Sequence, residues 1–211
     1  MSEQNQQAST SAREAILTRV KAGLAGLPKR ATLPDWSVEL AEARKLVEGK
    51  PDEQVFAERL RLVNGRSFTS VGEIGDALRA GGWTRGYCDP ELVPLVQAGL
   101  GAGITLETSF DRTRIDDYQF GITRARAAVA ETGSIMLDDA TTSRRLAALT
   151  PWVHVAVVRK ETIHRFLADA VLALPDDPNI ILATGPSKTA DVEGILIEGV
   201  HGPGQQWALL V

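Results

Sequence analysis

The sequence predicts an α/β fold, in which helices cover a sheet of strands. Helical patterns alternate with short apolar strands from Pro51 onward, an order typical of a sheet with helices on both faces. The segment WVHVAVV at 152–158 is apolar at successive positions, as expected for a central strand buried on both faces. The turn signal at 131–133 predicts an antiparallel strand pair, so the expected sheet is mixed and not purely parallel.

The N-terminal part of the chain differs from the rest. Residues 1–11 are polar and are predicted to form a disordered tail. Ser11 and Glu14 match a capping box, so a helix is expected from residue 12. We therefore divide the chain into a tail at 1–11, an N-terminal helical arm with a linker at 12–49, and one domain at 50–211.

The elements of this domain follow from caps and spacing. A first helix is expected after Asp52, with Asp52 as its cap, and a second after the capping box of Ser70 and Glu73. The elements expected after them are a strand at 83–88, a helix from Pro90, one strand at 120–129, its partner strand at 135–137, the central strand at 152–158, a helix at 161–174, a buried strand at 180–183, a helix from Ser187, and strands at 195–197 and 207–211.

Charge and cysteine content exclude several classes of function. The 211 residues carry 23 Lys and Arg against 27 Asp and Glu, a net charge of -4, so we expect no nucleic-acid partner. No basic leader or long apolar run is present, which predicts a cytoplasmic protein without a membrane span. Cys88 is the only cysteine, so neither an internal disulfide nor a four-thiolate iron–sulfur cluster is possible, and we expect no cofactor bound by this chain.

The loop after residue 183 is the first candidate site. A strand that runs into Gly185 and then into a helix would expose backbone N–H groups toward an anion. The expected ligand-binding residues are Gly185, Pro186, Ser187, Lys188, Thr189 and Asp191. The alternative is that Ser187 only caps the helix.

Two further residues are candidates for catalysis. Glu131 precedes a glycine at a strand end, where ligand sites of α/β proteins gather. His201 lies between glycines in a loop and could act as a base near neutral pH. A solvated turn glutamate and an exposed turn histidine are the alternatives. His154 is expected to be a hydrogen-bonded core residue, and no spacing typical of a metal site is present.

Arg124 and Arg126 are two residues apart on one predicted strand. Two neighbouring guanidinium groups must be solvated or paired with anions. They either bind acidic groups of a ligand or form ion pairs with Asp111, Asp116 or Asp117.

Two blocks of sequence resemble the LUD domain family, namely GITRARAAVAETGSIML at 121–137 and GPSKTADVEGILIEGVHGPGQQWALLV at 185–211. The resemblance implies the fold shared by glucosamine-phosphate deaminases, ribose-phosphate isomerases, CoA transferases and formyltetrahydrofolate cyclo-ligases. It also implies a role beside iron–sulfur partner proteins in converting L-lactate to pyruvate. The sequence Arg124-Ala125-Arg126 departs from the small Gly-Ala pair and acidic residue common in the family, so the resemblance does not carry over the ligand specificity.

Three functions follow as hypotheses. The first is an accessory subunit of an L-lactate oxidation system with a cleft for a small anionic ligand. The second is a free-standing enzyme similar to CoA transferases or cyclo-ligases, with Glu131 as nucleophile or base. The third is a non-catalytic sensor or scaffold. We expect Glu131, Ser187, Asp191 and His201 to line one cleft.

Overall fold

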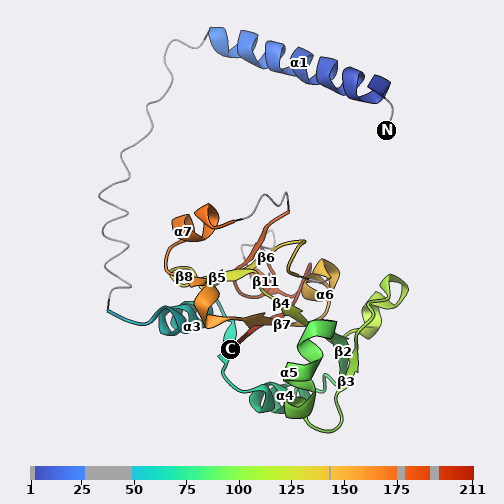
Figure 1. Cartoon of the computed structure of the whole chain (residues 1–211), viewed down its shortest axis with the longest axis vertical. Helices are drawn as coiled ribbons and strands as arrows, with labels where there is room; N and C mark the ends of the chain where they lie inside the picture. Colours follow the sequence, from blue (N-terminus) through green and yellow to red (C-terminus); the bar gives the residue numbers. More distant parts are fainter. Residues whose placement is uncertain (1–2, 27–48, 143, 175–178, 191–194) are drawn as a thin grey trace. The chain divides into compact units, whose positions relative to one another are not determined.

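The computed structural model describes residues 3–26, 49–142, 144–174, 179–190 and 195–211 (Figure 1). The chain divides into two compact units, Met1–Leu46 and Val47–Val211, and each is described by itself. No helix among the described residues has both the length and the apolar character needed to cross a membrane.

The described part of the first unit is the helix α1, Glu3–Ala25. It begins well before residue 12, so the predicted helix start is wrong, and the division into tail, arm and domain stays a prediction. The earlier start is possible because residues 3–11 contain no glycine or proline, and five of these nine residues are Gln, Glu or Ala, which favour a helix. The apolar side chains of Ile16, Leu17, Val20 and Leu24 are exposed.

The second unit contains all the strands of the described residues. Its elements in chain order are α3 (Asp52–Leu62), β1 (Arg66–Phe68), α4 (Val71–Ala80), β2 (Arg85–Cys88), η1 (Pro90–Leu92), α5 (Val93–Leu100), β3 (Thr105–Glu107), η2 (Arg112–Asp117), β4 (Phe120–Arg124), β5 (Ala127–Val129), β6 (Ser134–Leu137), α6 (Arg145–Leu149), β7 (Val153–Val158), η3 (Lys160–Thr162), β8 (Ile163–His164), α7 (Leu167–Leu172), β9 (Ile181–Ala183), β10 (Lys188–Ala190), β11 (Leu196–Glu198) and β12 (Gln205–Leu210).

The strands form a large parallel sheet and two smaller sheets. The large sheet has the order β1-β12-β7-β4-β2-β3, and all its neighbouring strands are parallel. A four-stranded sheet, β8-β5-β6-β9, contains parallel and antiparallel pairs. The α/β class and its mixed strand directions are therefore confirmed, although the antiparallel pairs lie outside the large sheet.

The strand β7 shows how the layers are packed. Val153, Val155 and Val157 belong to a core formed with α4 and α5, whereas Ala156 and Val158 belong to a core formed with α3 and the four-stranded sheet. The parallel sheet is thus covered by α4 and α5 on one face, and by α3 and the four-stranded sheet on the other (Figure 1). The four-stranded sheet is called the smaller sheet below. The outer face of the smaller sheet packs on α7. This confirms the central, buried strand predicted at 152–158, although it begins at Val153 and Trp152 is exposed.

The predicted strand at 120–129 is two strands in different sheets. The backbone N–H of Ala125 donates to Val157 of the parallel sheet, and the N–H of the next residue, Arg126, donates to Met136 of the smaller sheet. The chain therefore leaves one sheet and enters the other between these two residues. A single alternating pattern cannot reveal such a switch, because both strands have period two.

Three other sequence predictions are wrong in detail. The helix expected at 161–174 begins only at Leu167, because Ile163 pairs with β5 in a strand. Residues 181–183 form an edge strand that is partly exposed, not a buried one. Asp52 does not cap its helix, because Pro51 holds the cap position, and the Asp52 carboxylate instead pairs with Arg165 at 2.5 Å. The first two departures reflect strand pairing that overrides a local pattern.

Candidate functional site

A cavity of about 530 Å³ lies where the chain crosses from the parallel sheet to the smaller sheet. We call it the strand-end cavity. It is lined by Leu92, Arg124, Ala125, Arg126, Ala127, Thr141, Val157, Arg159, Glu161, Thr162, His164, Ala170, Ala173 and Leu174. The parallel strands β4 and β7 end at Arg124 and Val158. Ligands of open α/β sheets bind at this carboxyl edge.

Buried and surface carboxylates hold Arg124 in place. Its Nε donates to Asp89 Oδ2 at 2.7 Å, and its Nη1 donates to Glu91 Oε2 at 2.5 Å. The side chain of Asp89 is 1% exposed, whereas that of Arg124 is 27% exposed. Asp89 also caps the short helix η1 by accepting from the Glu91 N–H. The guanidinium is therefore fixed from the interior and retains an exposed part at the cavity.

Arg126 and Arg159 are less fully engaged. The Nε of Arg126 lies 3.7 Å from Asp138 Oδ2, beyond hydrogen-bond distance. The carboxylate of Asp138 is fully buried and accepts from the Thr141 N–H at 2.6 Å. Arg159 is exposed and follows β7 directly. Among the described residues Arg159 makes no ion pair, so both guanidinium groups keep N–H donors for a ligand.

The remaining lining residues offer one polar and one apolar side. His164 is half-buried and can donate or accept through its ring nitrogens. Ala127, Val157 and Ala170 are buried apolar residues. A small carboxylate could place its anionic end against Arg126 or Arg159 and a methyl group against this apolar wall.

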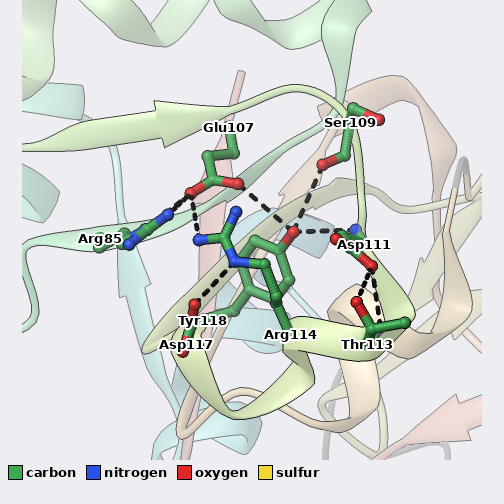
Figure 2. A network of polar contacts seen from close by, with 8 residues as sticks. All are labelled: Arg85, Glu107, Ser109, Asp111, Thr113, Arg114, Asp117 and Tyr118. Carbon is green, nitrogen blue, oxygen red and sulfur yellow. Dashed lines mark hydrogen bonds and ion pairs between the residues drawn. The ribbon is translucent and has the colours of Figure 1, made fainter.

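The prediction that Arg124 and Arg126 form ion pairs is confirmed, but the partners expected for them are wrong. Asp117 pairs with Arg114, and Asp111 accepts from Thr113 (Figure 2). Sequence reasoning missed Asp89, Asp138 and Arg159. All three had a signal, because each follows a predicted strand directly, and site residues of α/β sheets concentrate at strand ends.

The loop at 185–189 does not open a helix. Residues Lys188–Ala190 form β10, which pairs antiparallel with β11. The helix predicted from Ser187 is therefore wrong, and with it the N-terminal helix dipole expected to attract an anion. The Ser187 N–H donates to the Pro203 carbonyl at 2.9 Å. Lys188 Nζ donates to the Val63 carbonyl at 3.3 Å and lies 3.5 Å from Glu198. Anion binding by this loop stays a prediction.

The glycines of these motifs have a packing role against the end of α3. Gly133 has a φ of +67°, and a Cβ added there would lie 2.3 Å from the Leu60 nitrogen. Gly185 has a φ of +76°, and an added Cβ would lie 2.2 Å from the Val63 carbonyl oxygen. Only glycine combines this backbone conformation with so close a contact.

The segment around Gly133 contacts the segment around Gly185, which in turn contacts the loop around Gly202. The Ser134 and Thr184 hydroxyls are 2.7 Å apart, and a Cβ on Gly202 would lie 3.0 Å from that of Ser187. Neither Glu131, Ser187 nor His201 is among the described residues that line the strand-end cavity. Asp191 lies outside the described residues. That these four residues share one cleft stays a prediction.

Glu131 and His201 differ in how they are held. The Glu131 carboxylate accepts from the Leu167 N–H at 2.6 Å and so satisfies a free donor at the start of α7. His201 is exposed, whereas Pro186 in the loop at 185–189 is buried. Glu131 thus has a structural contact, and a catalytic role for Glu131 or His201 stays a prediction.

His154 is a core residue, as the sequence predicts. Its ring bridges the Thr123 hydroxyl at 2.9 Å and the Gln206 amide oxygen at 3.0 Å. Burial lowers the pKa of His154 from 6.5 to about 4, against an opposing effect of the Gln206 hydrogen bond. The ring is therefore neutral at pH 7.

Cys88 is buried, and burial, followed by the charge of Asp89, raises its thiol pKa to about 12. Within the described residues no group of His, Cys, Asp or Glu side chains could hold a metal ion.

Fold and cavity together define a parallel-sheet α/β protein with an arginine-lined cavity at the carboxyl ends of its strands. The LUD domain family model matches residues 95–211, more than half of the chain. The chain belongs to the LUD domain family.

Named relatives and one solved structure agree with this assignment. The chain is 28% identical over 205 residues to "Lactate utilization protein C" of Deinococcus radiodurans, which covers 93% of each chain. It is 33% identical over 108 residues to the protein of that name in Bacillus subtilis, a match that spans 46% of this chain and 44% of the relative. The crystal structure of a DUF162 family protein from Deinococcus radiodurans has the same fold, with a TM-score of 0.56 and 23% identity over 76% of this chain and 96% of that one.

Proposed function

We propose that this chain takes part in lactate utilisation in the cytoplasm, as a subunit that binds L-lactate or another small 2-hydroxy or 2-oxo monocarboxylate in the strand-end cavity. Iron–sulfur partner proteins carry the electrons removed when lactate becomes pyruvate, and this chain binds no cofactor of its own. The lone cysteine supports that division of labour, because a cluster needs several thiolates.

The main support for a role in lactate utilisation is the similarity to lactate utilization protein C. The match to the Deinococcus radiodurans protein extends over 93% of both chains, so it involves both the domain and the N-terminal region. A match of this extent favours a shared process more than a short shared motif does.

The charges around the strand-end cavity support a monoanion as ligand. Three arginines and Glu161 line it, and Asp89, Glu91 and Asp138 pair with two of those arginines. The seven groups carry three positive and four negative formal charges. Such a site offers directed N–H donors without a large positive field, which suits one carboxylate better than a dianion.

Purification from lactate-grown cells tests the proposed role. We expect the tagged full chain to retain proteins that contain iron and labile sulfide, and the complex to reduce a dye when L-lactate is added. The purified chain alone should not. Lactate oxidation by the isolated chain, or a chain that never co-purifies with iron–sulfur proteins, would contradict the proposal.

A further inference from the structure

A second cavity, of about 590 Å³, lies beside segment 138–142. Its lining residues are Phe110, Arg112, Asp139, Thr142, Arg144, Arg145, Leu146 and Leu149, and we call it the Phe110 cavity. Segment 138–142 contributes to both cavities, because Thr141 lines the strand-end cavity and Thr142 lines this one. The Thr142 hydroxyl donates to the Arg124 carbonyl at 2.9 Å, which anchors the segment on β4.

A network of polar contacts holds the wall that carries Phe110 and Arg112. Glu107 is paired with Arg85 and lies 3.5 Å from Arg114, and its other oxygen lies 3.4 Å from the Tyr118 hydroxyl (Figure 2). The Tyr118 hydroxyl in turn accepts from the Asp111 N–H at 2.9 Å. These contacts tie the loop between β3 and β4 to the edge of the parallel sheet, so the wall is preorganised.

The aromatic ring of Phe110 is fixed within this wall. It stacks on Tyr118 with ring centroids 4.8 Å apart and meets Tyr87 edge to face at 5.6 Å. Phe110 is half-buried and lines the cavity with the part that the two tyrosines leave uncovered. Together with Leu146 and Leu149 it gives the cavity an apolar, partly aromatic side.

Arginines give the Phe110 cavity a positively charged side beside the apolar one. Arg145 pairs with Asp139 at 2.6 Å. Arg112 and Arg144 are exposed and make no ion pair with any described residue. Acidic residues near them in the sequence have other partners: Asp111 accepts from Thr113, and Asp117 pairs with Arg114. The lining therefore has three positive charges and one negative charge.

We propose that the Phe110 cavity binds a phosphate monoester with a planar aromatic body, a ligand the size of a mononucleotide. Two unpaired guanidinium groups match the charge and geometry of a phosphate dianion. The aromatic and leucine side chains match a flat ring that stacks. The volume falls within the range of about 300–1,000 Å³ found for small-molecule sites. This site is separate from the one proposed for lactate, so each can fail without the other.

Titration of the full chain with AMP, adenosine and inorganic phosphate, followed by calorimetry, tests the proposal. We expect AMP to bind at least about tenfold more tightly than either fragment, because only AMP engages both sides of the cavity. Arg112→Ala and Arg144→Ala should each weaken AMP binding by about tenfold or more. Arg61→Ala, which removes an exposed arginine on α3, is the matched control and should leave it unchanged.

Phe110→Leu separates the aromatic contribution from the charge, since leucine keeps an apolar wall but cannot stack. We expect it to weaken AMP binding and to leave phosphate binding unchanged. Phosphate bound as tightly as AMP, with no effect of Phe110→Leu, would overturn the aromatic ligand class. No AMP binding, or AMP binding unaffected by both Arg112→Ala and Arg144→Ala, would overturn the site itself. Urea unfolding of each variant confirms that it is folded at the temperature of the titration.

Discussion

The two cavities beside segment 138–142 are both lined by arginines but differ in what lies behind the guanidinium groups. In the strand-end cavity, the fully buried Asp138 and the nearly buried Asp89 each face an arginine. In the Phe110 cavity, the one lining carboxylate, Asp139, is 42% exposed, and Arg112 and Arg144 have no acidic partner among the described residues. Buried carboxylates orient arginines and cancel their charge, whereas unpaired arginines leave a net positive field.

This difference separates two uses of the same side chain. At the strand ends, buried carboxylates orient Arg124 and Arg126, so these two side chains can position a small monoanion. Arginines around Phe110 lie on the surface of the fold and are available to a more highly charged ligand. The following predictions test the contrast, beginning with the largest effect.

The two cavities should differ most in how much stability is lost when a carboxylate beside an arginine is removed. Asp89→Ala deletes the ion pair with Arg124 and the cap on η1, and we expect it to lower the free energy of unfolding by about 3 kcal/mol or more. Asp139→Ala, its counterpart in the Phe110 cavity, should cost no more than about 1 kcal/mol because the pair is exposed. Urea unfolding measures both. Equal losses in the two variants would show that the cavities do not differ in this way.

Acid pH should weaken the sheet shared by both cavities without changing the charge of any arginine. The pKa of His154 is lowered from 6.5 to about 4 in the folded chain. Between these values the unfolded chain takes up a proton that the folded chain does not, so the free energy of unfolding falls as the pH falls. The full effect is about 3 kcal/mol and is absent above pH 6.5.

The variant His154→Gln isolates this contribution. It cannot titrate at residue 154, whereas His164 and His201 remain. Urea unfolding between pH 4 and 7.5 should therefore show a shallower loss of stability in the variant than in the natural chain. The same slope in both proteins would mean that the His154 pKa is not lowered by burial.

Added salt should lower the affinity for AMP more than the affinity for lactate, and this effect is smaller than the preceding ones. Raising the salt concentration from 50 to 500 mM should weaken AMP binding about tenfold and change lactate affinity by no more than about twofold, because screening acts on net charge. Calorimetric titrations at both salt concentrations measure the two ratios. Lactate binding that responds to salt as strongly as AMP binding would show that the strand-end arginines are not neutralised by their carboxylates.

The smallest effect is expected at Lys188. Its ammonium group contacts the Val63 carbonyl and lies near Glu198 on the surface, so Lys188→Ala should change stability by no more than about 0.5 kcal/mol. We also expect lactate affinity to stay the same. If Lys188→Ala weakens lactate binding while substitutions at the strand ends do not, the anion site is the loop at 185–189.

Much of the fold follows from the sequence because its elements have local causes. Ser70 caps α4, as the capping pattern predicts, and the apolar run at 152–158 becomes the central strand β7. The switch between sheets at Ala125 and Arg126 has no local cause. It depends on which carbonyl groups, of Val157 and Met136, are nearby in space, and these residues are far apart in the sequence.

The candidate site was harder to predict for the same reason. The conspicuous glycines at 133 and 185 mark close packing against α3, although their pattern also suits a ligand loop. Asp89 follows β2 of the parallel sheet and Asp138 follows β6 of the smaller sheet, and each lies near its arginine only in the folded chain. The spacing of these residues along the chain does not reveal which carboxylate pairs with which arginine.

Titration of the purified full chain with L-lactate tests the central claim most directly. We expect the natural chain to bind lactate, Arg126→Ala to bind it about tenfold or more weakly, and Arg112→Ala to bind it as the natural chain does. The first variant removes a strand-end guanidinium, and the second removes one from the Phe110 cavity. No binding by the natural chain, or equal affinity in the natural chain and Arg126→Ala, would contradict the account.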